Sequence, residues 1–190
     1  MADDILQIVV DSNEALPQHR GYRFPGDRVL QLDCADYSGW RCIDRLRIER
    51  KSLGDLLNCV GSRRQDFERG TLWPMTSYHY RYLLLEFSLP QLAAGGWSKP
   101  KVLPTAAIGS IFSWSIRYSV QPIFAGDAAH ARAAVMRIVK LVNKTVESPP
   151  AASDAARPLE SPPIDTAGTA HEPADETANA NDDDHPPASA

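Results

Sequence analysis

The sequence predicts an α/β domain in which a central mixed β-sheet is flanked by helices on both faces. Short β-branched runs alternate with longer runs of helical periodicity along the chain. The segment from Asp36 to Arg45 is too short for a crossover helix, so the early strands can pair antiparallel. With 190 residues, 43% of them hydrophobic, the chain has room for one ordinary domain and can build a core.

The first half of the chain contains three predicted strands and one predicted helix. The strands are expected at residues 6–11, 28–33 and 45–51. The first is a compact apolar run that ends on an acid, and the other two alternate, which is typical of strands with one face inward. Ser52 and Asp55 have the spacing of a capping box with Asp in place of Glu, so a helix is predicted to begin there.

The second half continues with helical and extended segments in alternation. A basic stretch at 62–69 is expected to begin a second helical piece, and residues 81–87 form the most hydrophobic predicted strand. Residues 104–118 are expected to be helical and residues 121–125 to form a short strand. The last helix is predicted to start with Asp127 as its N-cap residue. One apolar stripe marks the buried face of this helix: Ala131, Ala134, Val135, Ile138, Val139 and Val142.

Charge and composition separate residues 148–190 from the body of the chain, residues 1–147. This Pro/Ala-rich tail has nine acids, one base and no aromatic residue, which leaves a body with 15 acids and 19 bases. The tail cannot bury enough apolar surface to offset the entropy of ordering, so we expect it to be disordered. A basic body with an acidic tail is typical of polyanion-binding domains. Taken alone, however, so small an excess is better explained by scattered surface charge.

Several classes of protein are excluded by simple sequence features. No apolar run approaches the ~20 residues of a membrane helix, so no membrane partner is expected. Residues 1–7 contain two acids and no basic segment, which excludes a secretory signal. Cys34, Cys42 and Cys59 form neither an even set nor a C-x-x-C pair, which excludes a disulfide framework and a zinc ribbon. A reducing, intracellular location is therefore expected.

Four acids and one lysine lie where the predicted elements end. Asp11 ends the first strand, Asp36 follows the second, and Glu49 and Lys51 lie near the end of the third. Asp55 lies one turn into the following helix. Because residues i and i+2 of a strand share a face, Glu49 and Lys51 project together. If a hairpin aligns Asp36 beside Glu49, two carboxylates and an ammonium converge at one sheet edge.

These groups are the ones that metal-assisted phosphodiester hydrolysis requires. Carboxylate oxygens hold Mg²⁺, which keeps several waters and takes its remaining ligands from the substrate phosphate. The metal polarises the phosphoryl oxygen and lowers the pKa of a bound water. A lysine beside it can orient that water or stabilise charge on the phosphorus. The D-x(n)-(D/E)-x-K pattern alone is common by chance, and an ordinary solvent-facing strand has the same residues.

A longer pattern is more specific and consists of three blocks in order: VDSNE (10–14), CADY (34–37) and IERKSLGDLL (48–57). They resemble the V-D-x-R-E, G-D-Y and E-R-K-x-x-x-D blocks of the XPF family of structure-specific DNA endonucleases, and the resemblance spans the body of the chain. It implies a restriction-endonuclease-like fold and Mg²⁺-dependent cleavage, for which Mn²⁺ can substitute. The implied substrate is branched or flapped DNA at duplex/single-strand junctions, in repair or recombination. The implied location is cytoplasmic and nucleoid-associated in a prokaryote.

The resemblance also implies a role for individual residues of the site. Asp36 and Glu49 would bind the metal, with Asp11 close by as a third ligand or as support. Lys51 would be the catalytic lysine, so that the catalytic set is Asp36, Glu49 and Lys51. Arg50 would brace the site or touch phosphate.

Further residues around this site are candidates for support and for binding DNA. Asp55 would hold the site from the helix, according to the same resemblance. Arg63, Arg64 and Arg69 follow that helix and can clamp phosphates bidentately. A solvated helix face has the same composition, so both interpretations of these arginines stay open.

Two positions depart from the family pattern and leave an alternative open. Asn13 replaces an arginine, and Ala35 replaces a glycine, which restricts the backbone before Asp36. Only the tail follows the body here, where many relatives carry a helix-hairpin-helix domain. The grip on DNA must then come from the body, a homodimer or a partner subunit. The alternatives are a non-catalytic pseudo-nuclease that docks DNA or a partner, and another nuclease of the same fold.

Overall fold

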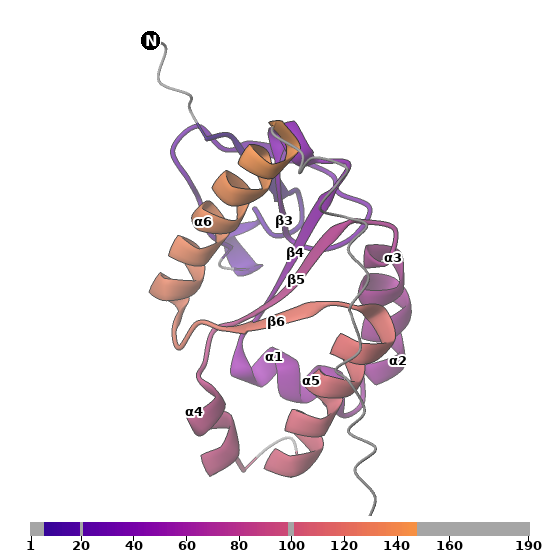
Figure 1. The fold of residues 1–190 in the computed structure, drawn as a ribbon. Coiled ribbons are helices and arrows are strands. Elements are labelled where there is room, and N and C mark those ends of the chain that lie inside the picture. The colour runs from indigo at the N-terminus through magenta and orange to yellow at the C-terminus, as the bar shows by residue number, and fades with distance from the viewer. Residues whose placement is uncertain (1–5, 20, 99–100, 148–190) are drawn as a thin grey trace, which may run out of the picture. The chain divides into compact units, whose positions relative to one another are not determined.

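The computed structural model describes residues 6–19, 21–98 and 101–147, and the predicted tail lies outside the described residues. Six strands in this part of the chain form one sheet with the order β2-β1-β3-β4-β5-β6 (Figure 1). The strands are β1 (Ile8–Asp11), β2 (Arg28–Leu30), β3 (Tyr37–Gly39), β4 (Leu46–Lys51), β5 (Tyr80–Leu85) and β6 (Gln121–Phe124).

The sheet is mixed, which confirms the predicted class. β3 pairs antiparallel with both β1 and β4, whereas β2 runs parallel to β1, and β4, β5 and β6 run parallel to one another. The sequence did not predict β3, because its three residues, Tyr37 to Gly39, are too few to show an alternating pattern. The expected hairpin therefore joins β3 to β4, and the shorter second strand lies at the edge of the sheet.

Helices lie on both faces of the sheet, as predicted (Figure 1). On one face α6 (Ala128–Glu147) contacts β3, β4 and β5. On the other face α1 (Leu53–Val60) contacts β4, and α5 (Pro104–Tyr118) contacts β6. The remaining helical segments are η1 (Pro17–His19), η2 (Trp40–Cys42), α2 (Arg64–Phe67), the π-helical η3 (Glu68–Leu72), α3 (Trp73–Met75) and α4 (Leu89–Ala94).

None of the helices in the described ranges is both long enough and apolar enough to cross a membrane.

The ends of the predicted helices are fixed by side-chain caps. The Asp55 backbone N–H donates to Ser52 Oγ at 3.2 Å, so Ser52 is the N-cap of α1 as predicted. The His130 backbone N–H donates to Asp127 Oδ1 at 2.8 Å, just before α6. The capping box at the start of α4 was not predicted, although its Ser88 carries the same signal as Ser52. Each cap satisfies backbone donors that the first helical turn leaves free.

Two hydrophobic clusters, one on each face, hold the helices to the sheet. Alternation along β5 sends Leu84 toward the α6 face and Leu83 and Leu85 toward the α1 and α5 face. The predicted apolar stripe of α6 lies in the cluster on the α6 face. All residues of this stripe are buried except Ala134, which is partly buried. The three cysteines are buried free thiols. The sheet is therefore covered on both faces, and its strand ends are left to carry polar groups.

Ala35 has the backbone conformation that the family pattern reserves for glycine. Its φ is 64°, in the left-handed region, directly before Asp36. This conformation costs a residue with a Cβ about 1–2 kcal/mol. The structure thus explains why a glycine is expected here and shows that alanine adopts the same turn.

We predict that Ala35→Gly changes the free energy of unfolding by less than about 0.5 kcal/mol. Relief of the left-handed strain offsets the added chain entropy of about 0.5–1 kcal/mol and the partly buried methyl group. Ala106→Gly, on the exposed side of α5, is the matched control and should lose about 1 kcal/mol. Urea denaturation measures both variants. Equal losses at the two positions would show that Ala35 is not strained.

Candidate active site

The register of the β3–β4 hairpin places two carboxylates side by side. Tyr37 is paired with Ile48, and the Asp36 N–H donates to the Ile48 carbonyl at 3.1 Å. In an antiparallel pair this register sets Asp36 opposite Glu49. The Arg50 N–H donates to Asp36 Oδ2 at 2.7 Å, which fixes that carboxylate against the end of β4. The alignment that the sequence analysis required is therefore present.

Glu49 and Lys51 project together from β4, as their spacing predicts. Lys51 Nζ donates to Glu49 Oε1 in a short ion pair. Glu49 is only 4% exposed, and the Lys51 ammonium also lies 4.9 Å from the centre of the Phe67 ring. Burial acts to lower the pKa of Lys51, but the charges of Glu49 and Asp36 outweigh it and raise that pKa. Lys51 is therefore a charged ammonium that offsets part of the negative charge of the two carboxylates.

Asp36 is the carboxylate whose charge is least favoured. Burial and the neighbouring charge of Glu49 raise its pKa well above the ordinary value, and Lys51 offsets only part of this. Two carboxylates this close repel one another unless a cation lies beside them. Lys51 supplies one positive charge, so the site retains a net preference for a further cation.

The donor set was tested against the requirements of Mg²⁺. Within the ranges described, no group of three or more His, Cys, Asp and Glu side chains forms a ready-made metal site. Mg²⁺, however, is usually bound through one or two carboxylates, with water and substrate phosphate as its other ligands. Asp36 and Glu49 meet that requirement. The residues present thus fit the predicted ion, and metal binding by them stays a prediction.

Asp11 lies next to this pair and is held by the backbone. Its two oxygens accept hydrogen bonds from the N–H groups of Asn13, at 2.8 Å, and Leu32, at 2.7 Å. The Asp11 N–H in turn donates to the Asp36 carbonyl at 2.8 Å. These hydrogen bonds fix the Asp11 side chain beside Asp36. Both predicted roles of Asp11, as a metal ligand and as support for the site, stay predictions.

Asp55 lies at the first turn of α1 and is exposed. Its Oδ2 accepts a hydrogen bond from Ser52 Oγ at 2.7 Å, while its N–H donates back to that oxygen. Since α1 begins directly after β4, this cap fixes the chain immediately beyond Lys51. This position agrees with the predicted supporting role of Asp55.

Arg50 points to the opposite face of β4 and forms a buried brace. Its Nε donates to Glu14 Oε1 at 2.7 Å, one Nη donates to Glu86 Oε1 at 3.0 Å, and the other donates to the His19 carbonyl at 3.0 Å. The hydrogen bonds and charges of Glu86 and Glu14 raise the pKa of Arg50 in spite of its burial. Of the two predicted roles, Arg50 has the bracing one in this structure.

Two tyrosines complete this brace: Tyr37, which belongs to the CADY block but was given no role, and Tyr22. The Tyr37 hydroxyl donates to Glu14 Oε1 at 3.0 Å and accepts from the Tyr22 N–H at 2.7 Å. The Tyr22 hydroxyl donates to Glu86, and the two tyrosine rings stack with centroids 5.6 Å apart. Glu14 belongs to the VDSNE block, which was recognised in the sequence, but no role was predicted for Glu14 itself. Glu86 and Tyr22 carried no sequence signal, because their partners are distant in the chain.

The three arginines proposed to bind DNA have different surroundings. Arg64 donates from Nε to Glu68, at 3.0 Å, and from an Nη to Ser110 Oγ, also at 3.0 Å, so it joins α2 to α5. Arg63 and Arg69 are exposed, and the described residues provide no side-chain partner for either. The latter two are thus the more accessible for phosphate, and their role stays a prediction.

Comparison with solved structures identifies the fold. XPF from Aeropyrum pernix matches with a TM-score of 0.53 and 16% sequence identity, over 74% of this chain and 67% of that chain. XPF from Aeropyrum pernix in complex with DNA matches with a TM-score of 0.51 and 17% identity, over 73% of this chain and 66% of that chain. This chain has an XPF-like nuclease fold.

The XPF-like fold confirms the fold class and the family resemblance that the three blocks predicted. The chain spans about two thirds of the length of each XPF chain. No protein-family model matches the sequence, and no curated protein sequence matches it. At this low identity the XPF match establishes the fold, and the chemistry has to be argued from the site residues.

Removal of Arg50 should be much more damaging than removal of an exposed arginine. We predict that Arg50→Ala lowers the free energy of unfolding by about 3–5 kcal/mol, because it leaves Glu14 and Glu86 buried without a counter-charge. Arg45→Ala, which removes an exposed pair with Asp44 at 3.8 Å, should cost at most about 1 kcal/mol. Urea denaturation separates the two outcomes. Similar small losses would contradict the bracing role.

Proposed function

We propose that this chain is a Mg²⁺-dependent DNA endonuclease with Asp36, Glu49 and Lys51 as its catalytic residues. The observation that carries the proposal is the convergence of these three side chains where β3 meets the end of β4. An XPF-like fold around the site supports a nuclease, and one of the matching XPF structures is a complex with DNA.

Each residue has a defined part in the proposed hydrolysis. Asp36 and Glu49 would hold the metal, which supplies a polarised phosphoryl oxygen and a bound water of lowered pKa. The charged Lys51 ammonium stabilises negative charge that develops on the phosphate and keeps Glu49 oriented. Arg50 holds the end of β4 from the opposite face, so the catalytic side chains are mounted on rigid backbone.

The proposed substrate is branched or flapped DNA at a junction between duplex and single strand, in repair or recombination. The support for this specificity is the ERKSLGDLL block and its resemblance to structure-specific endonucleases. Arg63 and Arg69 offer exposed guanidiniums for phosphate close to the helix that follows the site. An intracellular location and a homodimer or partner subunit belong to the same proposal.

A non-catalytic docking module is the second candidate. The observation that favours it is Asn13, which is exposed where the family pattern has an arginine, so a charge that would contact phosphate or a carboxylate is missing. The two candidates differ in whether the carboxylates bind a metal. Metal binding and cleavage therefore have to be measured separately.

We predict that the purified protein nicks a labelled flap substrate in the presence of Mg²⁺ and stops when the metal is chelated. Glu49→Gln and Lys51→Ala should each reduce the cleavage rate by at least about a hundredfold, since the first removes the charge of a proposed metal ligand and the second removes the ammonium that stabilises the phosphate. Lys140→Ala, an exposed lysine of α6, is the matched control and should cut like wild type. Circular dichroism checks that the variants fold. Unchanged cleavage by both site variants would refute the assignment.

Metal binding should stabilise the protein independently of cleavage. At a Mg²⁺ concentration about a hundredfold above the dissociation constant, we expect Tm to rise by roughly 5–10 °C. Asp36→Asn should abolish this shift, because it removes one of the two proposed ligands. Asp44→Asn, at a highly exposed carboxylate, should retain it. Equal shifts in all three proteins would place the metal elsewhere and favour the docking module.

A further inference from the structure

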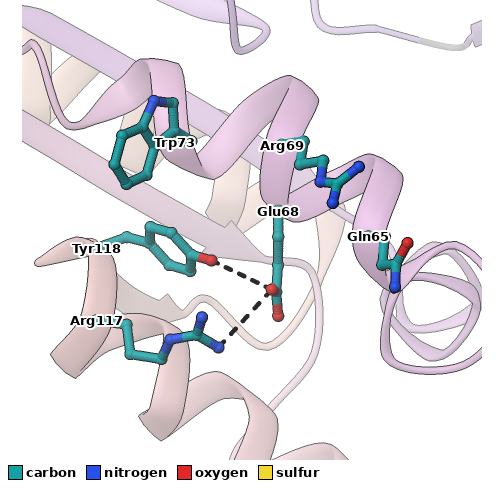
Figure 2. Close-up of a pocket in the computed structure, with 6 residues that line it drawn as sticks. All are labelled: Gln65, Glu68, Arg69, Trp73, Arg117 and Tyr118. Atoms are coloured by element: carbon teal, nitrogen blue, oxygen red, sulfur yellow. Dashed lines mark hydrogen bonds and ion pairs between the residues drawn. The ribbon is translucent and has the colours of Figure 1, made fainter.

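A polar cavity is lined mainly by residues 65–73, which follow the proposed active-site residues in the sequence. Its volume is about 320 Å³. Figure 2 shows its lining, which comes from the run of α2, η3 and α3 on one side and the end of α5 on the other. The lining residues are Gln65, Glu68, Arg69, Trp73, Arg117 and Tyr118. The volume is at the low end of the range for ligand pockets, which is room for one small polar molecule.

Glu68, which lines this cavity, accepts hydrogen bonds from three other side chains of the protein. Its Oε1 accepts from Trp114 Nε1 at 2.7 Å and from Arg64 Nε at 3.0 Å, and its Oε2 accepts from the Tyr118 hydroxyl at 3.2 Å. Burial acts to raise the pKa of Glu68, but these hydrogen bonds and the charges of Arg64 and Arg117 lower it. The carboxylate is therefore ionised and already accepts three hydrogen bonds from the protein.

The two other arginines at the cavity keep most of their hydrogen-bonding capacity. Arg117 lies 3.7 Å from Glu68 Oε2, which is longer than a charge-assisted hydrogen bond (Figure 2). Arg69 is exposed, and no side-chain partner for it occurs in the ranges described. The lining thus contains two positively charged guanidiniums and one carboxylate that is already hydrogen-bonded within the protein. The net positive charge favours binding of an anion.

Trp73 adds an aromatic surface beside these arginines. It is 68% exposed, far more than Trp114, which is fully buried. It directly follows η3, and π-helical turns occur often at functional sites. Single exposed apolar residues are common on protein surfaces. An exposed indole that lines the same cavity as two guanidiniums is, however, a combination with which proteins hold unpaired bases and their phosphates.

The cavity is connected to the proposed active site through Phe67. The Lys51 ammonium lies 4.9 Å from the centre of the Phe67 ring, and Phe67 immediately precedes Glu68. The Phe67 ring also packs edge-on against Trp114, with centroids 5.1 Å apart. Phe67 and Trp114 are buried, so these contacts join the helical run that lines the cavity to the proposed active site through the core.

We propose that this cavity binds one nucleotide of a single-stranded DNA segment, with the base on Trp73 and the phosphate on Arg69 and Arg117. A single strand is specified because the bases of a duplex are stacked on one another and offer no free face to an indole ring. This inference rests on the proposed function, since it assigns the unpaired arm of the branched substrate to a particular surface.

The test measures binding of a short labelled oligothymidylate by fluorescence anisotropy in EDTA, so that no metal or cleavage is involved. Trp73→Ala should weaken binding by at least about fivefold, the lower limit for loss of one stacked base. Trp73→Phe should retain most of the affinity. Arg69→Gln should reduce the slope of log affinity against log salt by about 0.7. Arg137→Gln, at an exposed arginine of α6, is the matched control and should change neither quantity.

Tryptophan fluorescence gives a second readout of the same site. Stacking of a base on Trp73 should quench the emission of the wild-type protein, and this quenching should disappear in Trp73→Phe while binding persists. Wild-type affinity in both Trp73→Ala and Arg69→Gln overturns the inference, and so does a wild-type protein that binds no oligothymidylate. If the wild-type protein cleaves DNA with Mg²⁺ but these variants bind the oligonucleotide like wild type, nucleotide binding in the cavity is refuted while the proposed nuclease activity stands. Weakened binding without any cleavage by wild type refutes only the nuclease.

Discussion

Antiparallel pairing of Tyr37 with Ile48 brings the carboxylates of Asp36 and Glu49 to one edge of the sheet. A shift of one residue in this register would turn Glu49 to the opposite face of β4 and separate the two acids. The pairing therefore imposes an electrostatic cost, because burial and mutual repulsion oppose ionisation of Asp36. Lys51 offsets part of that cost, and a divalent cation would offset more of it.

The side chains of β4 have different roles on the two faces of the sheet. Glu49 and Lys51 face the side of the sheet that carries the proposed chemistry, whereas Arg50 faces a buried network with Glu14 and Glu86. The network holds the strand from behind by charge-assisted hydrogen bonds, which are the stronger class. A catalytic site on a braced strand keeps its geometry better than a site on a loop. The ERK sequence thus encodes both the proposed catalytic groups and their support.

The alternation in residues 45–51, the cap at Ser52 and the stripe of α6 were predictable because each is a local pattern with a known period. The three-residue strand β3 was not, since so short a segment shows no period and is defined by its neighbours on both sides. The partners of Arg50 could not be predicted either, because Glu14 and Glu86 each lie 36 residues away in sequence. Such contacts depend on how the strands are ordered in the sheet.

The central claim is that Asp36 and Glu49 share a divalent cation at the end of β4. The most direct measurement is anomalous X-ray scattering from a crystal of the protein soaked with Mn²⁺. If both carboxylates bind the ion, an anomalous peak is expected within about 2.0–2.3 Å of oxygens from each of them, close to the distances of hard-cation coordination. A saturating soak that leaves both carboxylates without an anomalous peak, or that places the ion on other residues, would contradict it.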